Sequence, residues 1–428
     1  MNRLRYSAAV GCVALAVAAV APTRVYAQGG VLDCSTLADP DHLIYMAGTT
    51  AVMPVIRLLG ARLKQIGVTL LWNENDEGCH QVFGLAYPDS RQAQRPVFTQ
   101  YTEAVGQPGL VIPANCNGTY NQLPDLVIND VPYTSCQFAY NDPERNQLPP
   151  GLGEFEGPVQ GLVPIVASSY MYYDDIAAEE LQDLYVCGAA AKILLTFTSD
   201  ADILGYDPAK SGMHELWARA IGLTNGLALA TGLGGRFSDL NAETMVTLAV
   251  GPTTTPDLTF GYTSTEFYDQ YRDRVRALKV RGPNQELAYL PDSDLTSTDK
   301  LNLREGRYTL QGSLRLVAAI DGATGKVSNA AARHMIDWLQ GNPPETADLN
   351  LPFDVNQVYA ERGVVPQCAM KVTHAGNSTA FKHYTPAQPC HCSFQLLATG
   401  KTSLEGCVPC TDASACQAGQ QCSHGYCE

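Results

Sequence analysis

The stretch YMAGTTAVMPVIRLLGARLKQIGVTLLWN, residues 45–73, decides the fold because its pattern is that of a strand, a helix and a second strand. Residues 43–47 form a short apolar run that predicts a strand, and residues 68–72 form another. Between them, the apolar side chains of residues 53–66 recur at helical spacing, and Gly67 ends the predicted helix. The stretch therefore predicts one unit of an α/β fold.

Similar units follow along the chain. Strands are predicted at the ranges 126–128, 161–167 and 193–197, and helices at 177–185 and 214–221. Strands that alternate with helices indicate an α/β fold with mainly parallel sheets. About 340 residues of ordinary globular composition exceed one small core, so we expect two lobes.

The N-terminus has the pattern of a secretory signal peptide. Arg3 and Arg5 precede the uncharged apolar run 8–20, and small residues precede a cleavage site after Ala27. An alternative is a lipoprotein signal ending at Cys12, although this cysteine falls inside the apolar run. We therefore expect an exported protein, periplasmic, extracellular or on the cell surface. No later stretch predicts a membrane-spanning helix.

The mature chain is strongly acidic. Cleavage after residue 27 removes three arginines and no acid, which leaves 25 basic and 43 acidic side chains and a net charge of −18. Phosphates of nucleic acids and anionic lipids are attracted to basic surfaces, so a nucleic-acid partner is not expected.

Thirteen of the fourteen cysteines lie after the predicted cleavage site, and in an exported protein most are expected to form disulfides. Seven of them fall within the last 39 residues, in a glycine-rich segment with few apolar residues. We expect this segment to be a small module held by disulfides, joined by a polar linker at 373–385. The odd number of cysteines implies either one free thiol or one disulfide between two chains.

Polar or glycine-containing loops follow several predicted strands, where open α/β sheets bind ligands. They are 48–51 (Gly-Thr-Thr-Ala), 75–79, 129–132 (Asn-Asp-Val-Pro) and 210–213 (Lys-Ser-Gly-Met). Backbone N–H groups at a helix entrance, together with hydroxyl groups, can hold an oxyanion. Each loop alone also has the composition of an ordinary helix cap.

Together these segments resemble the type 2 periplasmic solute-binding proteins, and within them the phosphate-binding group of ABC transporter receptors. The resemblance covers residues 40–370 and rests on the following segments: AGTTAVMPVIRLLGARL, LPDLVINDVPYTSC, GLVPIVASSYMYYDDIAAEELQDLYVCG, YDPAKSGMHELWARAIGL and YLPDSDLTSTDKLNLREGRYTLQGSLRLV. It implies two lobes joined by crossovers, with residues 28–160 and 301–372 in the first lobe and 161–300 in the second. Residues 373–428 form the linker and the cysteine-rich module.

The resemblance also implies a ligand site in the cleft between the lobes. Thr49 and Thr50 would face the anion from the first helix, and Ser211 and Gly212 from the second lobe. Asp130 would accept a hydrogen bond from a protonated oxyanion, which admits hydrogen phosphate and rejects sulfate.

The sequence departs from the phosphate-binding pattern at several positions. Asp207 stands where the family has an arginine, Met213 replaces a threonine, and Glu77 replaces a small hydroxylated residue. Two extra carboxylates oppose the binding of a dianion. Lys210 offers a positive charge, but without the bidentate geometry of a guanidinium.

The sequence gives little support for a metal site or for enzymatic catalysis. The histidines lack metal-ligand spacing, and neither a nucleophile elbow nor a phosphate-cradling loop is found. Cys79 and Cys136 follow two of the candidate loops, so a disulfide between them, or one that involves Cys116, would brace the cleft.

We therefore expect a binding protein with no enzymatic activity, cofactor or metal. It would capture phosphate, a related oxyanion or another solute for a membrane permease. The alternative is a two-lobed scaffold that has lost its ligand and acts as a secreted or surface interaction protein.

Overall fold

The protein is described by a computed structural model in which twelve segments are placed. They comprise residues 32–37, 42–73, 78–88, 96–136, 147–188, 203–206, 210–223, 237–238, 242–250, 259–341, 351–374 and 380–428. The predicted signal peptide, the predicted strand at 193–197, Glu77 and Asp207 all lie outside these segments.

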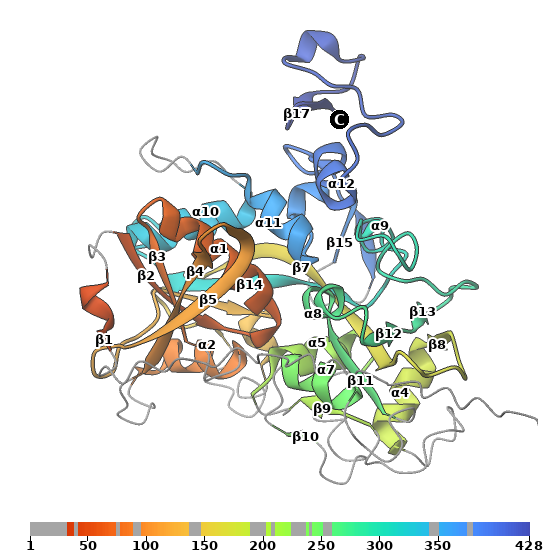
Figure 1. Cartoon of the computed structure of the whole chain (residues 1–428), viewed down its shortest axis with the longest axis horizontal. Helices are drawn as coiled ribbons and strands as arrows, with labels where there is room; N and C mark the ends of the chain where they lie inside the picture. The colour runs from red at the N-terminus through yellow and green to blue at the C-terminus, as the bar shows by residue number, and fades with distance from the viewer. Residues whose placement is uncertain are drawn as a thin grey trace, which may run out of the picture.

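A mixed, ten-stranded sheet forms the framework of the molecule, in the strand order β1-β5-β4-β3-β2-β6-β14-β7-β11, with β12 paired to β7. In the first lobe its strands are β1 (Leu32–Asp33), β2 (Leu43–Gly48), β3 (Thr69–Asn73), β4 (Val97–Ala104), β5 (Gln107–Asn117), β6 (Leu126–Asn129) and β14 (Gln311–Ala319). Helices α1 (Met53–Gln65), α10 (Ala330–Gln340) and α11 (Val355–Arg362) lie on one side of this sheet, and α2 (Gly78–Ala86) lies on the other (Figure 1).

Strand β7 (Leu152–Ala167) is 16 residues long and belongs to both lobes. Its first half pairs with β14, from Leu152 to Gly161, and its second half pairs with β11 (Phe260–Ser264) and β12 (Val275–Ala277). From Gly157 onward nearly every residue of β7 is buried, as expected for a strand covered on both faces. The two lobes therefore share one continuous strand.

The second lobe gathers short strands and helices around the second half of β7. They are β8 (Asp175–Ala177), α4 (Ala178–Cys187), β9 (Gly205–Tyr206), α5 (Gly212–Ala220), β10 (Phe237–Ser238), α7 (Ala242–Val250), α8 (Thr265–Gln270) and β13 (Lys279–Arg281). Strands β8 and β13 pair in parallel, as do β9 and β10. Helix α9 (Leu301–Arg304) then leads the chain back to β14.

The C-terminal segment begins with the antiparallel pair β15 (Val372–His374) and β16 (Phe381–His383), where the sequence predicts a polar linker. Helix α12 (His391–Thr399) follows, and β17 (Cys422–Ser423) and β18 (Tyr426–Cys427) close the chain. Cys390 and Phe394 belong to the main hydrophobic cluster, so α12 packs on the body, while Cys392 of the same helix is linked to the terminal module through its disulfide with Cys407. Residues beyond α12 project away from the lobes (Figure 1).

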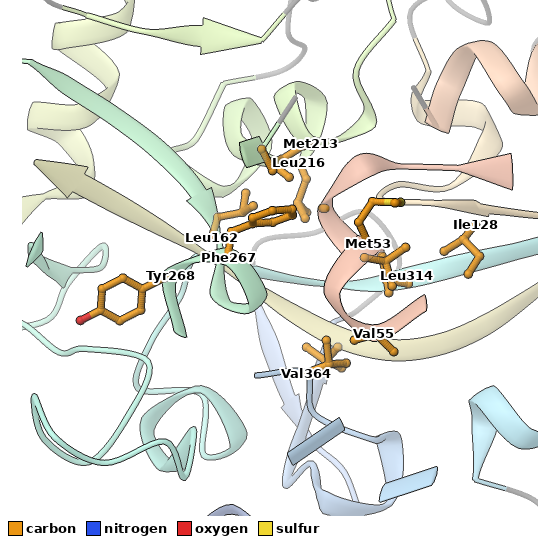
Figure 2. Packing of buried hydrophobic residues seen from close by; sticks show 14 of the residues in the cluster. Met53, Val55, Ile128, Leu162, Met213, Leu216, Phe267, Tyr268, Leu314 and Val364 are labelled. Atoms are coloured by element: carbon orange, nitrogen blue, oxygen red, sulfur yellow. The ribbon is translucent and has the colours of Figure 1, made fainter. Parts of the chain in front are cut away.

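One contiguous cluster of buried apolar side chains runs through both lobes. Met53 and Val55 reach it from α1, and Met213 and Leu216 reach it from α5, with Leu162 of β7 between the lobes (Figure 2). Burial of apolar surface contributes about 25 cal/mol of stabilising free energy per Å². The continuous apolar cluster therefore stabilises the arrangement in which the two lobes are in contact. Among the described residues, no helix is both long and apolar enough to cross a bilayer.

Six disulfides link the cysteines of the described segments: Cys34–Cys116, Cys79–Cys136, Cys368–Cys390, Cys392–Cys407, Cys410–Cys422 and Cys416–Cys427. The predicted Cys79–Cys136 bond is confirmed, whereas Cys116 pairs with Cys34. Cys187 is the free, exposed thiol of these segments, which accounts for the odd number after the predicted cleavage.

The α/β class is confirmed, and the strands and helices predicted around residues 43–72, 126–128, 177–185 and 214–221 are all present. The expectation of mainly parallel sheets is wrong. Strands β3, β2 and β6 pair in parallel, but β14 and β7 run antiparallel because the chain crosses between lobes and returns through the same sheet. The strand predicted at 161–167 is the second half of the longer β7.

Arg304, at the end of α9, joins the body to the C-terminal segment. Its side chain is 1 % exposed and donates hydrogen bonds to the carbonyl oxygens of Ala369 (3.1 Å) and His391 (3.2 Å). The guanidinium also lies over the ring of Phe394, 5.4 Å from its centroid. A buried cation thus links the carbonyl oxygens of two segments, one on each side of the Cys368–Cys390 bond.

Replacing Arg304 with Met should lower the free energy of unfolding by about 2 kcal/mol or more, because buried carbonyls lose charge-assisted hydrogen bonds. Urea denaturation of the oxidised protein measures this. The matched control is Arg307→Met at an exposed position, which should change stability by less than about 0.5 kcal/mol. Equal effects of the two substitutions would contradict the role of Arg304.

Candidate functional site

Asp130 lies at the centre of the candidate site, immediately after strand β6. This strand is the short buried run Leu-Val-Ile-Asn, and it pairs with β2 on one side and β14 on the other. Its carboxyl end is therefore held rigidly in the middle of the sheet. The side chain of Asp130 is 1 % exposed.

The Asp130 carboxylate has one satisfied and one unsatisfied oxygen. Gln160 of β7 donates from Nε2 to Oδ1 at 2.6 Å, while Oδ2 has no hydrogen-bond partner within the described segments. Burial raises the pKa of Asp130 to about 6, although the hydrogen bond from the Gln160 amide and the nearby Thr49 hydroxyl oppose the rise. The unsatisfied oxygen can accept a hydrogen bond from a ligand.

Helix α5 of the second lobe points its N-terminus at this carboxylate. Ser211 caps the helix, and its Oγ accepts a hydrogen bond from the backbone N–H of His214 at 3.3 Å. A Cβ atom on Gly212 would lie 2.9 Å from Asp130 Oδ2 and 2.5 Å from Asn129 Oδ1, so only glycine fits. The helix end and the end of β6 are therefore in direct contact across the lobes.

Aromatic packing holds α5 in this position. The ring of Trp217 stacks on the ring of Tyr262, with centroids 4.1 Å apart and planes within 6°. His214 Nδ1 lies 3.0 Å from the Tyr262 hydroxyl oxygen. Because Tyr262 belongs to β11, the direction of α5 is set by the strand that pairs with β7.

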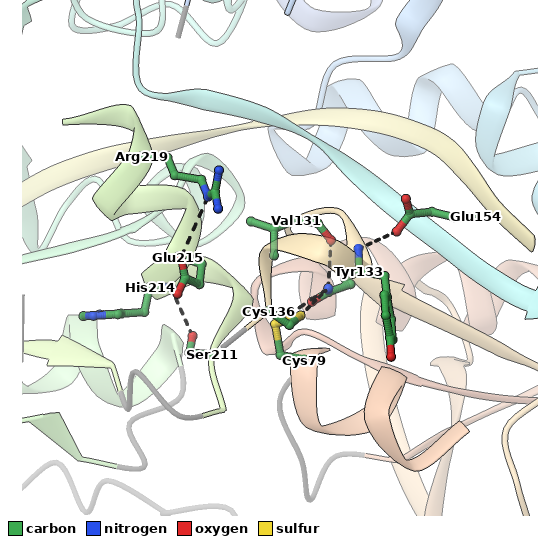
Figure 3. Close-up of a disulfide and its surroundings, with 10 residues drawn as sticks. Cys79, Val131, Tyr133, Cys136, Glu154, Ser211, His214, Glu215 and Arg219 are labelled. Atoms are coloured by element: carbon green, nitrogen blue, oxygen red, sulfur yellow. Dashed lines mark hydrogen bonds and ion pairs between the residues drawn. A yellow bond between two sulfur atoms is a disulfide. The ribbon is translucent and has the colours of Figure 1, made fainter. Parts of the chain in front are cut away.

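Asn129 connects the site to a disulfide. Its Nδ2 donates to the carbonyl oxygen of Val131 at 2.8 Å and lies 3.3 Å from Cys136 Sγ. Figure 3 shows Val131 beside the Cys79–Cys136 bond. The Oδ1 atom of Asn129 is buried without a hydrogen-bond partner among the described residues. A Cβ on Gly78, the first residue of α2, would also collide with this oxygen.

The Gly-Thr-Thr loop lies at the start of the first helix, as predicted. Thr49 is buried, and its Oγ1 accepts a hydrogen bond from Ala51 N at 3.2 Å, which caps the 3-10 turn η3 (Thr50–Val52). Thr50 is partly exposed. Ser264 of β11 donates from Oγ to the Ala51 carbonyl oxygen at 3.3 Å, which gives a second contact between the lobes.

A second buried carboxyl, Glu266, accompanies Asp130. Burial raises the pKa of Glu266 to about 8, and the charge of Asp130 adds to the rise, while hydrogen bonds from Ser264 and Thr265 oppose it. Thr265 donates to Oε2 at 3.1 Å, and Oε1 has no hydrogen-bond partner among the described residues. At neutral pH this group is mainly the neutral acid, which can donate a hydrogen bond.

The structure brings together Thr49, Asp130 and Gly212, with Ser211 capping the same helix end. Thr50 lies beside Thr49 but starts η3 at a partly exposed position. Met213, where the phosphate-binding pattern has a threonine, is buried in the main apolar cluster. The assignment of these residues to ligand binding stays a prediction.

Two side chains of this site, Gln160 and Glu266, were not predicted from the sequence. Asn129 was predicted as part of the loop 129–132, without a role of its own. Gln160 lies on β7, the strand shared by the two lobes, and Glu266 follows the end of β11 in the sequence Thr-Ser-Thr-Glu, residues 263–266. The hydroxyl-bearing residues of that sequence were the one available signal. The contact of Gln160 and Glu266 with Asp130 depends on the pairing of β7 with β11, which the sequence does not specify.

No metal site is evident among the described residues. The two groups with suitable spacing are Cys368, Cys390 and His424, and Cys410, Cys416 and Cys427. Every cysteine in both groups is disulfide-bonded, and metal binding requires the thiolate.

A scan against protein-family models gave no match, and neither did a search of curated protein sequences. Solved structures do match. A candidate phosphate ABC transporter substrate-binding protein from Clostridium perfringens, with bound phosphate, aligns at 13% identity and a TM-score of 0.46, covering 76% of this chain and 99% of that chain.

The phosphate-bound periplasmic protein PfluDING aligns at 13% identity and a TM-score of 0.44, covering 76% of this chain and 90% of that chain. An ABC-type phosphate transport receptor from Vibrio cholerae aligns at 12% identity and a TM-score of 0.39, covering 76% and 99%.

The Glu266 carboxyl should make the stability of the protein depend on pH. Its pKa is about 8 in the folded protein and about 4.5 when unfolded, so folding favours the protonated form. The stability it provides is complete below pH 4.5 and is lost as the pH rises through 8. Glu266→Gln, which mimics the neutral acid, should therefore flatten the fall of the free energy of unfolding between pH 5 and 8.

Urea denaturation at several pH values checks this, with the exposed Glu286→Gln as control, which should follow the wild-type curve. Each unit of pKa difference corresponds to about 1.4 kcal/mol. Parallel curves of the free energy of unfolding against pH for the wild type and Glu266→Gln would contradict the raised pKa of Glu266.

Replacing Gly212 with Ala should separate the lobes, because the added methyl group collides with Asn129 and Asp130. We expect a lower melting temperature and a larger radius of gyration by small-angle X-ray scattering. Gly322→Ala is the matched control, since a Cβ there meets nothing within 4 Å. Unchanged scattering and stability in Gly212→Ala would mean that the contact is loose.

Proposed function

We propose that this protein is an exported solute-binding protein that captures phosphate or a related oxyanion in the cleft between its lobes. The observation that carries the proposal is the position of Asp130. Its buried carboxylate faces the N-terminus of α5 from the opposite lobe and keeps one oxygen without a hydrogen-bond partner among the described residues.

Donors for an oxyanion are available on both sides of this carboxylate. The first N–H groups of α5, next to Ser211 and Gly212, have no partner within the helix and carry the positive end of its dipole. Thr49 and Thr50 offer hydroxyl groups from the first lobe. Asp130 would accept the proton of hydrogen phosphate, and sulfate has no such proton at neutral pH.

Capture would involve closure of the two lobes about β7 and β14. Contacts between the lobes include Gly212 against Asn129 and Asp130, the hydrogen bond from Ser264 to Ala51, the ion pair of Arg57 with Glu243, and packing within the main apolar cluster. In the closed form these contacts exclude water from the ligand, which strengthens its hydrogen bonds. Opening would need these contacts to separate.

The proposed setting is outside the cytoplasm, with delivery of the ligand to a membrane permease for ABC-type uptake. Six disulfides support the compartment, because disulfides persist in oxidising environments. The proposed role involves binding and no enzymatic step.

A second candidate, a secreted or surface interaction protein whose cleft binds no solute, is favoured by two observations. Glu266 adds a second buried carboxyl next to Asp130, and above about pH 8, where it ionises, its charge opposes a dianion. Asn129 Oδ1 also fills the space between Gly78 and Gly212.

A thermal-shift titration of the oxidised mature protein with phosphate and sulfate tests the proposal. Phosphate should raise the melting temperature saturably, since a ligand at 100 times its Kd stabilises by about 2.7 kcal/mol. Asp130→Asn and Ser211→Ala should reduce this shift by weakening binding. The control Asp183→Asn, an exposed carboxylate on α4, should retain it.

A flat response to phosphate would overturn the receptor proposal in favour of the interaction protein. An equal response to phosphate and sulfate would contradict the role of Asp130 as acceptor of the ligand's proton.

A further inference from the structure

A cavity of about 60 Å³ adjoins the cleft site, between α5 and β14. This volume holds roughly four water molecules or one small anion. Its walls come from α5 of the second lobe, from β14, and from the loop that follows β6. Asp130 also lines it, so the cavity begins where the cleft site ends.

Two guanidinium groups line this cavity from different elements. Arg219 lies near the end of α5, on the same helix as Ser211 and opposite the loop that carries Val131 (Figure 3). Arg315 lies on β14. Their side chains are 19% and 21% exposed, so both are largely withdrawn from solvent.

The ion pair that Arg315 makes with Glu156 is long. Arg315 Nη2 is 3.4 Å from Glu156 Oε1. Charge-assisted hydrogen bonds measure about 2.7–2.9 Å, so this pair is not tightly made. Arg315 Nε is buried and has no hydrogen-bond partner within the described part of the chain.

Two hydroxyl groups complete the donor set. Ser135 is fully buried, and its Oγ has no hydrogen-bond partner among the described residues. The same holds for Oγ1 of Thr309, which precedes β14. Both residues line the cavity. A buried hydroxyl without a partner costs about 1–3 kcal/mol, which a bound oxygen atom would remove.

The side chains that line the cavity offer fewer hydrogen-bond acceptors than donors. Asp130 Oδ2 is buried and without a partner in the described segments, whereas Glu156 is 48% exposed and its charge is screened by solvent. The lining thus requires a ligand with several anionic oxygens for the arginines and hydroxyls and one O–H group for Asp130.

We propose that this cavity is a second binding subsite, for a small oxyanion that carries a hydroxyl group. Arg219 and Arg315 hold its charge, Ser135 and Thr309 donate to its oxygens, and Asp130 accepts its proton. The subsite goes beyond the function proposed above, because it can fill while the Ser211 end of the cleft stays empty.

Isothermal titration of the oxidised mature protein with inorganic phosphate tests this at neutral pH. Arg315→Met should weaken one phosphate-binding event by at least about tenfold, the equivalent of one charge-assisted hydrogen bond. Ser135→Ala should weaken the same event. Arg307→Met, on an exposed arginine, should leave binding unchanged, and sulfate should bind more weakly than phosphate.

Ser211→Ala separates this inference from the cleft proposal. If Ser211→Ala removes one event and Arg315→Met another, both sites are present. A single event that responds to Arg315→Met and not to Ser211→Ala supports the subsite alone. A single event that responds only to Ser211→Ala, or no phosphate binding by the wild type, overturns the inference.

Chemical modification of the wild-type protein gives a readout that does not depend on how a variant folds. Phenylglyoxal modifies accessible arginines, and peptide mass spectrometry measures the extent at each position. Phosphate should protect Arg219 and Arg315 and leave Arg307 equally reactive. Equal modification of all three arginines with and without phosphate would contradict the subsite.

Discussion

Strand β7 is the constraint on which the rest of the structure depends. Sixteen residues at about 3.3 Å each give a strand roughly 50 Å long, which pairs with β14 in the first lobe and with β11 and β12 in the second. A strand hydrogen-bonded along both halves cannot bend sharply without losing ladder bonds. The lobes therefore share a fixed axis, and the groups that meet across the cleft do so at positions set by backbone pairing.

Backbone pairing explains how so many polar groups come to be buried near Asp130. Gln160 is on β7, Glu266 follows β11, and Asp130 follows β6, so the sheet places one amide and two carboxyl groups close together. Isolated buried charges are costly, and the protein responds with raised pKa values and hydrogen bonds. Several acceptor oxygens still have no partner among the described residues, and in an oxyanion site these select for a ligand that carries its own proton.

The disulfides divide into two structural roles. Cys79–Cys136 ties the start of α2 to the loop after β6 and so fixes the first-lobe wall of the site, next to Asn129. Cys392–Cys407 ties α12 to the terminal segment, and the two bonds beyond α12 hold that segment, which has almost no apolar core of its own. Arg304 and the Cys368–Cys390 bond attach that segment to the body through buried groups, so its attachment is firm although the module beyond α12 is exposed.

The sequence by itself determined the α/β class, the first strand–helix–strand unit, the position of Asp130 at a strand end and the entrance of α5, because these follow from local periodicity and capping. It did not determine that the main sheet is mixed, that residues 372–383 pair as strands, or that α12 packs on the body. The roles of Gln160, Glu266 and the Arg219–Arg315 cavity were likewise set only by the tertiary structure. The mixed sheet and the polar groups buried near Asp130 depend on which distant segments pair through β7 and β14, and long-range pairing leaves no periodic signal in the chain.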